Sequence, residues 1–269
     1  MTHLRRADAP ISAAAWAEID AEATRTLEHY LSARKLVDFV GPLGWEASSL
    51  PLGRAGDLAT PPVEGVAAAQ RTVRPLVELR RELALARREI DAIDRGARDA
   101  DLGPVVAAAR DLARAEDLAV LEGYAAAGIV GIGEASPHDP VELSEDFDRS
   151  PNPVAAALAV LKAEGVGGPY AIALGPRCYK GVIETTERGG YPLPQPRPLI
   201  LGGPVIGPPA VDGAIVLSQR GGDFELTVGQ DISIGYASHD GESVRLYLEE
   251  SLTFSALSPE AAVPLRYPG

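Results

Sequence analysis

The 269-residue sequence predicts a mixed α+β protein, and three observations lead to this prediction. Two segments, 12–34 and 103–124, place apolar residues at helical spacing. Short apolar runs such as 170–174 have the length and composition of buried strands. The segment 244–256 alternates apolar residues at a period of two, which predicts a long strand with one face in solvent. Because helices and strands are interspersed, the pattern indicates an α+β architecture.

The first helix is expected to begin after Ser12, a suitable N-cap residue. Its apolar residues recur at intervals of three or four, and mostly charged residues fill the other positions. The apolar set is Trp16, Ile19, Ala23, Leu27 and Leu31. The spacing predicts about five turns that end near Arg34, followed by a short strand over 35–40 that a Gly-Pro pair interrupts.

The stretch 48–72 is rich in glycine, proline and small polar residues, with Pro61 and Pro62 at its centre. A structureless stretch of this length is unusual inside a compact domain. We therefore interpret it as a functional loop, an arm that pairs elsewhere, or a disordered segment. After Pro75 the spacing favours a strand first and then a helix towards residue 93.

The clearest long helix is predicted over 103–124, with Pro104 at its first position, where a missing N–H is tolerated. The stripe along one face of this helix consists of Val105, Ala109, Leu112, Glu116 and Val120. Glycines at 128, 131 and 133 are expected to end the helix. Another helix is predicted over 154–164, where Gly165 ends it.

Further strands are predicted over 214–218 and 224–228. The turn sequence Arg-Gly-Gly-Asp at 220–223 is expected to join them as a hairpin. In the final long strand, Glu250 interrupts the apolar face. The proline-rich stretch 191–209 is expected to be mostly irregular.

The composition argues against several classes of protein. A net charge of −13 argues against a binder of nucleic acid or of anionic membranes, because both need a basic surface. A single cysteine excludes a disulfide framework, a four-cysteine zinc site and an iron–sulfur cluster, and it suits a reducing cytosol. The apolar runs are too short to span a membrane, and no targeting signal is visible. We expect a cytoplasmic protein with no nucleic-acid and no membrane partner.

The sequence contains no recognisable arrangement of catalytic residues. The four histidines lack the spacing of helical metal pairs. The glycines at 128, 131 and 133 end a predicted helix, whereas those of the dinucleotide fingerprint open one. Glu249 and Glu250 are adjacent on a strand and so point to opposite faces. We expect no enzyme activity, no catalytic residue, no cofactor and no metal.

Six segments, in order from residue 9 to residue 254, resemble the encapsulins, which are bacterial nanocompartment shell proteins. The shorter ones are Ala9-Pro10-Ile11 with Ala15-Trp16, Gly41–Glu46, Pro75–Arg80, Glu89–Asp91 and Val244–Phe254. The most specific segment runs from Arg220-Gly221-Gly222-Asp223-Phe224 through Gly229-Gln230-Asp231-Ile232-Ser233-Ile234-Gly235-Tyr236. Together they cover nearly the whole chain.

The resemblance implies the major capsid protein fold of tailed bacteriophages, with an N-terminal helix that lines the shell interior. Five regions follow from it. They are the N-terminal helix and start of the peripheral domain (1–47), the extended loop (48–72), the peripheral domain with its spine helix (73–131), the axial domain (132–219) and the peripheral-domain sheet (220–269).

The resemblance further implies a structural shell subunit. Sixty copies, as icosahedral symmetry requires with one subunit per asymmetric unit, would enclose a cargo enzyme of the ferritin-like or dye-decolourising peroxidase class. A C-terminal targeting peptide of the cargo would lie in a groove between the first helix and the peripheral sheet. The matching groove positions are Leu27, Leu31, Arg34, Asp38, Asp231, Ile232 and Ile234. A pore at the five-fold axis would be framed by Glu184, Glu187, Gly189, Gly190 and Tyr191.

Three other functions remain open from the sequence. A phage major capsid protein would share the fold but enclose a genome, and the interior helix argues against it. A hydrolase is disfavoured because no nucleophile motif is present. A small-molecule binding protein is disfavoured because no pocket-forming motif is found.

Overall fold

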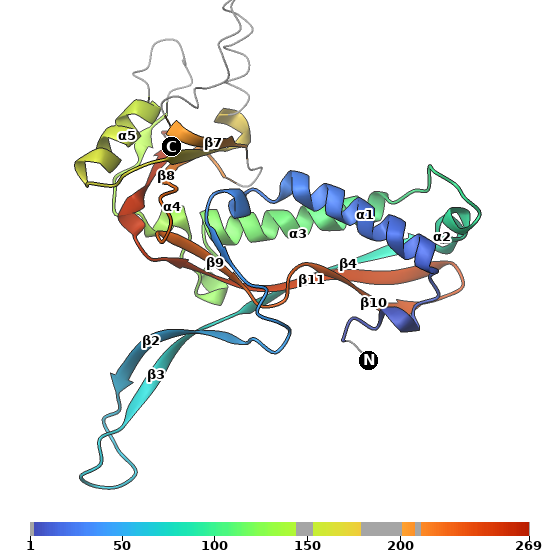
Figure 1. Cartoon of the computed structure of the whole chain (residues 1–269), viewed down its shortest axis with the longest axis horizontal. Helices are drawn as coiled ribbons and strands as arrows, with labels where there is room; N and C mark the ends of the chain where they lie inside the picture. Colours follow the sequence, from blue (N-terminus) through green and yellow to red (C-terminus); the bar gives the residue numbers. More distant parts are fainter. Residues whose placement is uncertain (1–2, 144–152, 179–200, 208–210, 269) are drawn as a thin grey trace, which may run out of the picture.

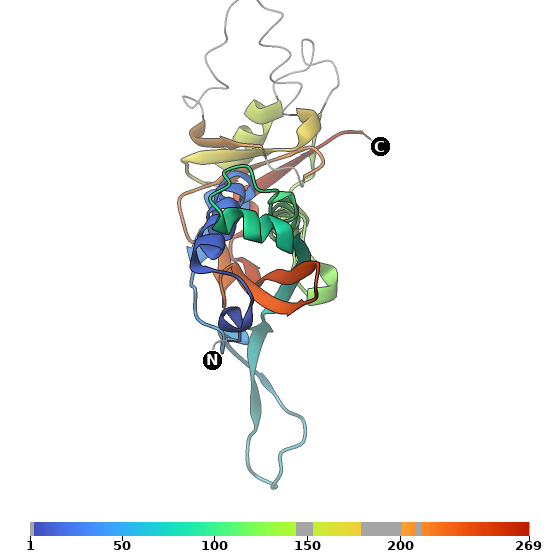
Figure 2. The same cartoon turned by 90° about the vertical axis from the view of Figure 1, so that its right-hand side faces the viewer.

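The computed structural model describes residues 3–143, 153–178, 201–207 and 211–268, and Figure 1 shows their arrangement. These residues form two five-stranded sheets and a two-stranded hairpin. In both Figure 1 and Figure 2 the hairpin projects from one end of the molecule, and the second sheet lies towards the other end. The mixed α+β class predicted from the sequence is confirmed.

The first sheet is organised around β11 (Ser243–Ala256), which is long enough to pair with three other strands. β4 (Val77–Ala86) runs antiparallel along one edge of β11. β10 (Ser233–His239) and then β9 (Phe224–Val228) pair with the other edge, also antiparallel. β1 (Asp38–Val40) adds to β9 in parallel.

Three helices cover one face of this sheet, as Figure 1 shows for the two long ones. They are α1 (Ala13–Tyr30), α2 (Arg87–Asp94) and α3 (Gly103–Leu121). Ser12 caps α1 as predicted, since its Oγ accepts the Ala15 N–H at 3.0 Å. Ile19 of α1, Leu112 of α3 and Leu246 of β11 share one apolar core. Burial of these faces holds the helices against the sheet.

The second sheet carries its own core. Its strands, in spatial order, are β5 (Val141–Glu142), β12 (Ala262–Arg266), β8 (Ala214–Ser218), β6 (Tyr170–Leu174) and β7 (Gly202–Ile206). α4 (Ile132–Ala135) and α5 (Pro153–Ala163) pack against β12. Short 3₁₀ turns are η1 (Arg6–Asp8), η2 (Ala33–Lys35), η3 (Ala125–Ala127) and η4 (Pro259–Ala261).

The glycine- and proline-rich stretch forms an antiparallel hairpin of β2 (Ser49–Asp57) and β3 (Ala69–Pro75). The two strands pair with each other, so the stretch is a hairpin and not a disordered segment; pairing with another element is not recorded among the described residues. At its base Arg74 donates to the backbone oxygen of Phe254 and to Ser255 Oγ. Its large apolar residues are exposed, namely Leu52, Leu58, Val63, Val66 and Val73.

Two predictions about the C-terminal strands are wrong. β8 and β9 do not form a hairpin, because β8 pairs with β6 and β12 while β9 belongs to the first sheet. The turn at 220–223, in which Arg220 pairs with Asp223, instead carries the chain from one sheet to the other. The predicted solvent-exposed face of β11 is also absent, because both faces are buried along most of the strand and Glu250 is only 1% exposed.

Both long helices end earlier than predicted. α1 ends at Tyr30 because the N–H groups of Ser32 and Ala33 donate to Asp117 of α3 and so leave the helical pattern. α3 ends at Leu121, and Gly123 with φ of 102° follows its C-cap. The glycines after 124 therefore lie beyond the helix end.

Gly123→Ala is expected to destabilise the protein more than Gly128→Ala. Both glycines have positive φ, which costs a residue with a Cβ about 1–2 kcal/mol. A Cβ at Gly123 would also lie 2.9 Å from the Gly131 N and 2.8 Å from Glu134 Oε2, whereas nothing lies within 4 Å of a Cβ at Gly128. In chemical denaturation we expect Gly123→Ala to lose about 1–3 kcal/mol more of the free energy of unfolding than Gly128→Ala. Equal losses would contradict the close approach.

Candidate functional site

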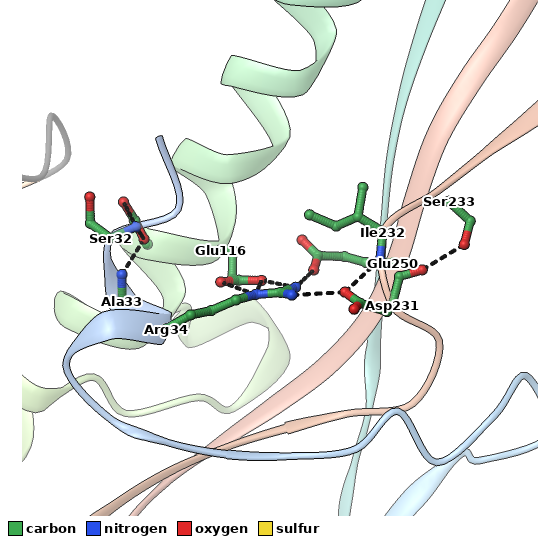
Figure 3. A network of polar contacts seen from close by, with 9 residues as sticks. Ser32, Ala33, Arg34, Glu116, Asp231, Ile232, Ser233 and Glu250 are labelled. Carbon is green, nitrogen blue, oxygen red and sulfur yellow. Dashed lines mark hydrogen bonds and ion pairs between the residues drawn. The ribbon is translucent and has the colours of Figure 1, made fainter. Parts of the chain in front are cut away.

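The guanidinium of Arg34 joins several elements that flank the predicted groove, as Figure 3 shows. Its Nε and Nη2 donate to Glu116 of α3 at 2.6–3.0 Å. Its Nη1 donates to Asp231, in the turn between β9 and β10, at 2.8 Å. Its Nη2 also lies 3.4 Å from Glu250 of β11. We call Arg34, Glu116, Asp117, Asp231 and Glu250 the Arg34 junction.

Asp117 fixes the segment that follows α1. Its carboxylate accepts the N–H of Ala33 at 2.7 Å and that of Ser32 at 3.0 Å. These two bonds act as an N-terminal cap for η2, which otherwise has no side-chain cap. α3 therefore fixes Arg34 in two ways. Asp117 holds the backbone just before Arg34, and Glu116 holds its guanidinium.

Asp231 positions the start of β10. Its Oδ1 accepts the Ile232 N–H at 2.8 Å in addition to the Arg34 bond, and its backbone oxygen accepts the Ser233 hydroxyl at 2.8 Å. Ile232 is thereby held at the edge of the core that α1, α3 and the first sheet share. Leu27 of α1 packs at the edge of the same core, and both side chains are half-buried.

The remaining predicted groove residues lie in different surroundings. Ile234 is buried in the core, with 6% of its surface exposed. Leu31 follows α1 directly and is half-buried. Asp38 is exposed and accepts the Gly222 N–H at 2.6 Å. Asp38 lines a separate cavity of about 240 Å³ together with Gln219 and other residues. The structure thus pairs Arg34 with Asp231, packs Leu27 and Ile232 against the same core, and gives Asp38 a partner outside the Arg34 junction.

The predicted pore residues lie outside the residues that the structure describes. They are Glu184, Glu187, Gly189, Gly190 and Tyr191.

Several residues of this site were not predicted. Glu116 and Glu250 each interrupt an apolar stripe in the sequence, and a carboxylate in such a stripe signals a buried charge with a partner. Asp117 carried no such signal. Phe39, which is 38% exposed, lies with its ring centre 5.0 Å from the Arg34 guanidinium carbon, and only the fold brings the two together.

Burial shifts the protonation of this junction. It raises the pKa of Asp117 to about 7, although the N–H groups of Ala33 and Ser32 oppose the shift. Burial, followed by the charge of Glu116, raises the pKa of Glu250 well above its usual value. Burial alone would lower the pKa of Arg34, but its bonds to Glu116 and Asp231 raise it. The guanidinium is therefore permanently charged, and the carboxyl groups are the titratable partners.

The family comparison agrees with this architecture. The family model described as "Encapsulating protein for peroxidase" matches residues 1–253. The chain belongs to the encapsulin family. A type 1 encapsulin shell protein of Rhodospirillum rubrum is 55% identical over 271 residues, which cover 99% of this chain and 97% of the relative. The resemblance found in the sequence is confirmed.

Solved structures support the predicted capsid fold. A virus-like particle from Pyrococcus furiosus has a TM-score of 0.64 at 17% identity, covering 92% of this chain and 98% of its own. A structure from Mycobacterium phage Bobi has a TM-score of 0.57 at 15% identity, covering 89% of this chain and 91% of its own. The major capsid protein fold of tailed bacteriophages is confirmed.

Family membership makes this encapsulin chain a structural shell subunit and not an enzyme. The hydrolase and small-molecule-binding alternatives are set aside, because the relatives are shell proteins over nearly the full chain. The relatives also favour an encapsulin shell over a phage capsid. Within the described part of the chain, no helix combines the length and apolar composition needed to cross a membrane.

Asp117→Asn is expected to flatten the dependence of stability on pH. Because the folded-state pKa of Asp117 is raised to about 7 from 3.8, the stabilisation that its proton provides is complete below about pH 4 and is lost as pH rises towards 7. Asparagine has no such titration and still offers an oxygen to the two N–H groups. The free energy of unfolding should be measured between pH 4 and 8 for both proteins. Over this range the wild type should lose up to about 4 kcal/mol more of it than the variant. Parallel profiles would contradict the shift.

Proposed function

We propose that sixty copies of this encapsulin close into an icosahedral shell and that the C-terminal peptide of a cargo enzyme docks between α1 and the start of β10. The family description supports a peroxidase as cargo, and a ferritin-like protein is the other class that the resemblance implies. The single observation that carries the docking site is that half-buried Leu27 and Ile232 pack against the same core, while Asp231, next to Ile232 in the chain, is held by Arg34.

The hairpin β2–β3 supports the assembly. It projects from the body with five large apolar side chains exposed, among them Val63 at 62%. Beyond its base the arm is exposed in its own subunit, and it gains stability when a neighbouring copy covers it. An apolar arm that reaches beyond its own subunit fits a closed assembly of identical copies.

The geometry beside α1 supports peptide docking. Half-buried Leu27, Leu31 and Ile232 can receive small apolar side chains of a cargo peptide. Asp231, whose side chain is 43% exposed, offers an acceptor to the peptide's backbone or to a basic group. Arg34 is only 18% exposed and is occupied by Glu116, so we assign it to positioning Asp231. Asp38 is proposed as an outer contact of the peptide.

The pore is proposed for Glu184, Glu187, Gly189, Gly190 and Tyr191 at the five-fold axis, on the family resemblance alone. Repeated glutamates would favour the entry of cations over anions. Glu184→Lys with Glu187→Lys should slow the entry of small cations to an enclosed cargo. Unchanged entry into intact shells would remove this segment from the pathway.

Removing the arm is expected to prevent shell closure. A variant in which an Asn-Gly turn replaces residues 52–72 keeps the base of the hairpin, with Pro51 opposite Val73, but loses four of its five exposed apolar residues. The wild type should have a native mass of about 1.7 MDa, sixty times the 28.1 kDa chain. The variant should remain folded by circular dichroism and form only small oligomers. Complete shells from the variant, or a stable monomer from the wild type, would contradict the proposal.

Leu27→Ala is expected to release cargo without preventing assembly. Each lost apolar anchor removes about 1.5–3 kcal/mol of burial, or one to two decades of affinity. The measurement is the binding of a monomeric fluorescent protein fused to the native cargo tail, since a multimeric cargo would mask the loss through avidity. Leu31→Ala should act in the same direction, and Asp38→Ala should weaken binding less.

Thr24→Ala is the matched control, because Thr24 is exposed on the same helix. Full loading of intact Leu27→Ala shells would assign Leu27 to core packing alone.

A further inference from the structure

Two buried carboxyl groups meet at one nitrogen of the Arg34 junction. Arg34 Nη2 lies 2.6 Å from Glu116 Oε2 and 3.4 Å from Glu250 Oε2. Both glutamate side chains have no exposed surface. Figure 3 shows the two carboxyl groups on the same side of the guanidinium, Glu116 from α3 and Glu250 from β11. A single Nη2 therefore brings oxygens of two carboxyl groups together away from water.

The charges around Glu250 do not balance if every carboxyl group is ionised. Glu116 faces it from α3, Asp231 from the turn before β10, and Arg34 from η2. On β4 the residue in register with Glu250 is Leu79. The neighbouring Arg80 lies 3.9 Å from Glu249, which points to the opposite face of β11. Among the described residues, Arg34 is thus the one cation recorded in contact with Glu250.

The hydrogen bonds also fit a protonated Glu250. Its Oε1 is buried and has no hydrogen-bond partner, and its Oε2 has only the long contact with Arg34. An ionised carboxylate in such a place would lose its hydration without replacement. A neutral carboxyl group loses much less on burial, and its O–H can donate to the Glu116 carboxylate. Two carboxyl groups in contact share a proton for the same reason in other buried pairs.

We propose that Glu250 is protonated and donates to the Glu116 carboxylate, so that the two residues share one proton and the Arg34 junction opens when that proton is lost to water at alkaline pH. No bond other than the O–H bond breaks, and solvent hydroxide takes the proton. Burial and the charge of Glu116 raise the pKa of Glu250, which agrees with this assignment.

The shared proton would regulate the groove, and this consequence depends on the proposed function. Arg34 holds Asp231, and Asp231 holds the Ile232 N–H. A second negative charge beside Glu116 would repel Asp231 and compete for the guanidinium. The start of β10 and the segment 31–36 after α1 would then become mobile together, and an apolar cargo tail would be held less tightly at alkaline pH than at neutral pH.

The test uses purified full-length shells without cargo. Asp117, whose pKa is raised to about 7, also loses a proton over this range, so its contribution is identified with Asp117→Asn and subtracted. The remaining difference infrared spectrum between neutral and alkaline pH should show a protonated-carboxyl band that disappears as pH rises. Hydrogen-exchange protection of residues 31–36, corrected for the intrinsic rate, should fall at least tenfold over the same pH range. Glu250→Gln should lack the band and keep its protection at alkaline pH, because glutamine mimics the protonated acid. Glu82→Gln, an exposed residue of β4, is the control and should behave as the wild type.

A band that persists in Glu250→Gln would overturn the assignment, and so would an equal loss of protection in Glu250→Gln and the wild type. Glu116→Gln is the second variant should Glu250→Gln fail to fold. With its negative neighbour removed, Glu250 should ionise at lower pH, so the band should disappear earlier; an unchanged titration would also overturn the proposal. If the wild type shows both signals but never binds the tail fusion, the shared proton stands and the proposed groove is wrong.

Discussion

The guanidinium of Arg34 is the contact on which the arrangement of the first sheet and its helices depends. It links η2, α3, the turn before β10 and β11, four elements that are distant in sequence. Because Asp117 holds the backbone just before Arg34, the end of α1 cannot slide along α3 without breaking this set. The apolar core stabilises the packing of α1 against α3 and the sheet. The Arg34 junction fixes the position of α1 along α3.

A buried ion cluster is a costly way to obtain that register. Taking charges from water costs several kcal/mol per ion, and an apolar cluster of equal volume is often as stable. The directional hydrogen bonds of a planar guanidinium to carboxylates fix the relative position of the elements that carry them. Contacts between leucines and valines are not directional and cannot do this. The core beside the junction is rich in alanine, leucine, valine and isoleucine, which specify position weakly. We infer that the junction is retained for position and not for stability.

The sequence predicted elements whose signals are local and missed those that depend on the fold. Ser12, Pro104 and the period-two pattern of residues 244–256 are local, and the Ser12 cap, a helix start one residue before Pro104 and the long strand are found. The turn at 220–223 has the composition of a hairpin, yet sheet membership is decided by distant partners. The links from Arg34 to Glu116 and to Glu250 span 82 and 216 residues of sequence in the same way, although each glutamate was visible as an interruption.

One strand connects the proposed interior site to the arm. Glu250 belongs to the Arg34 junction, and Phe254 and Ser255 of the same β11 accept Arg74 at the base of the hairpin. At about 3.4 Å per residue, the two points are some 17 Å apart along a strand that pairs with β4 as far as Leu252 and with β9 from Leu252 onward. Between them Leu252 and Thr253 are fully buried. A buried strand that is hydrogen-bonded along its whole length passes little side-chain rearrangement from one end to the other, so groove and arm can change independently while β11 keeps their relative orientation.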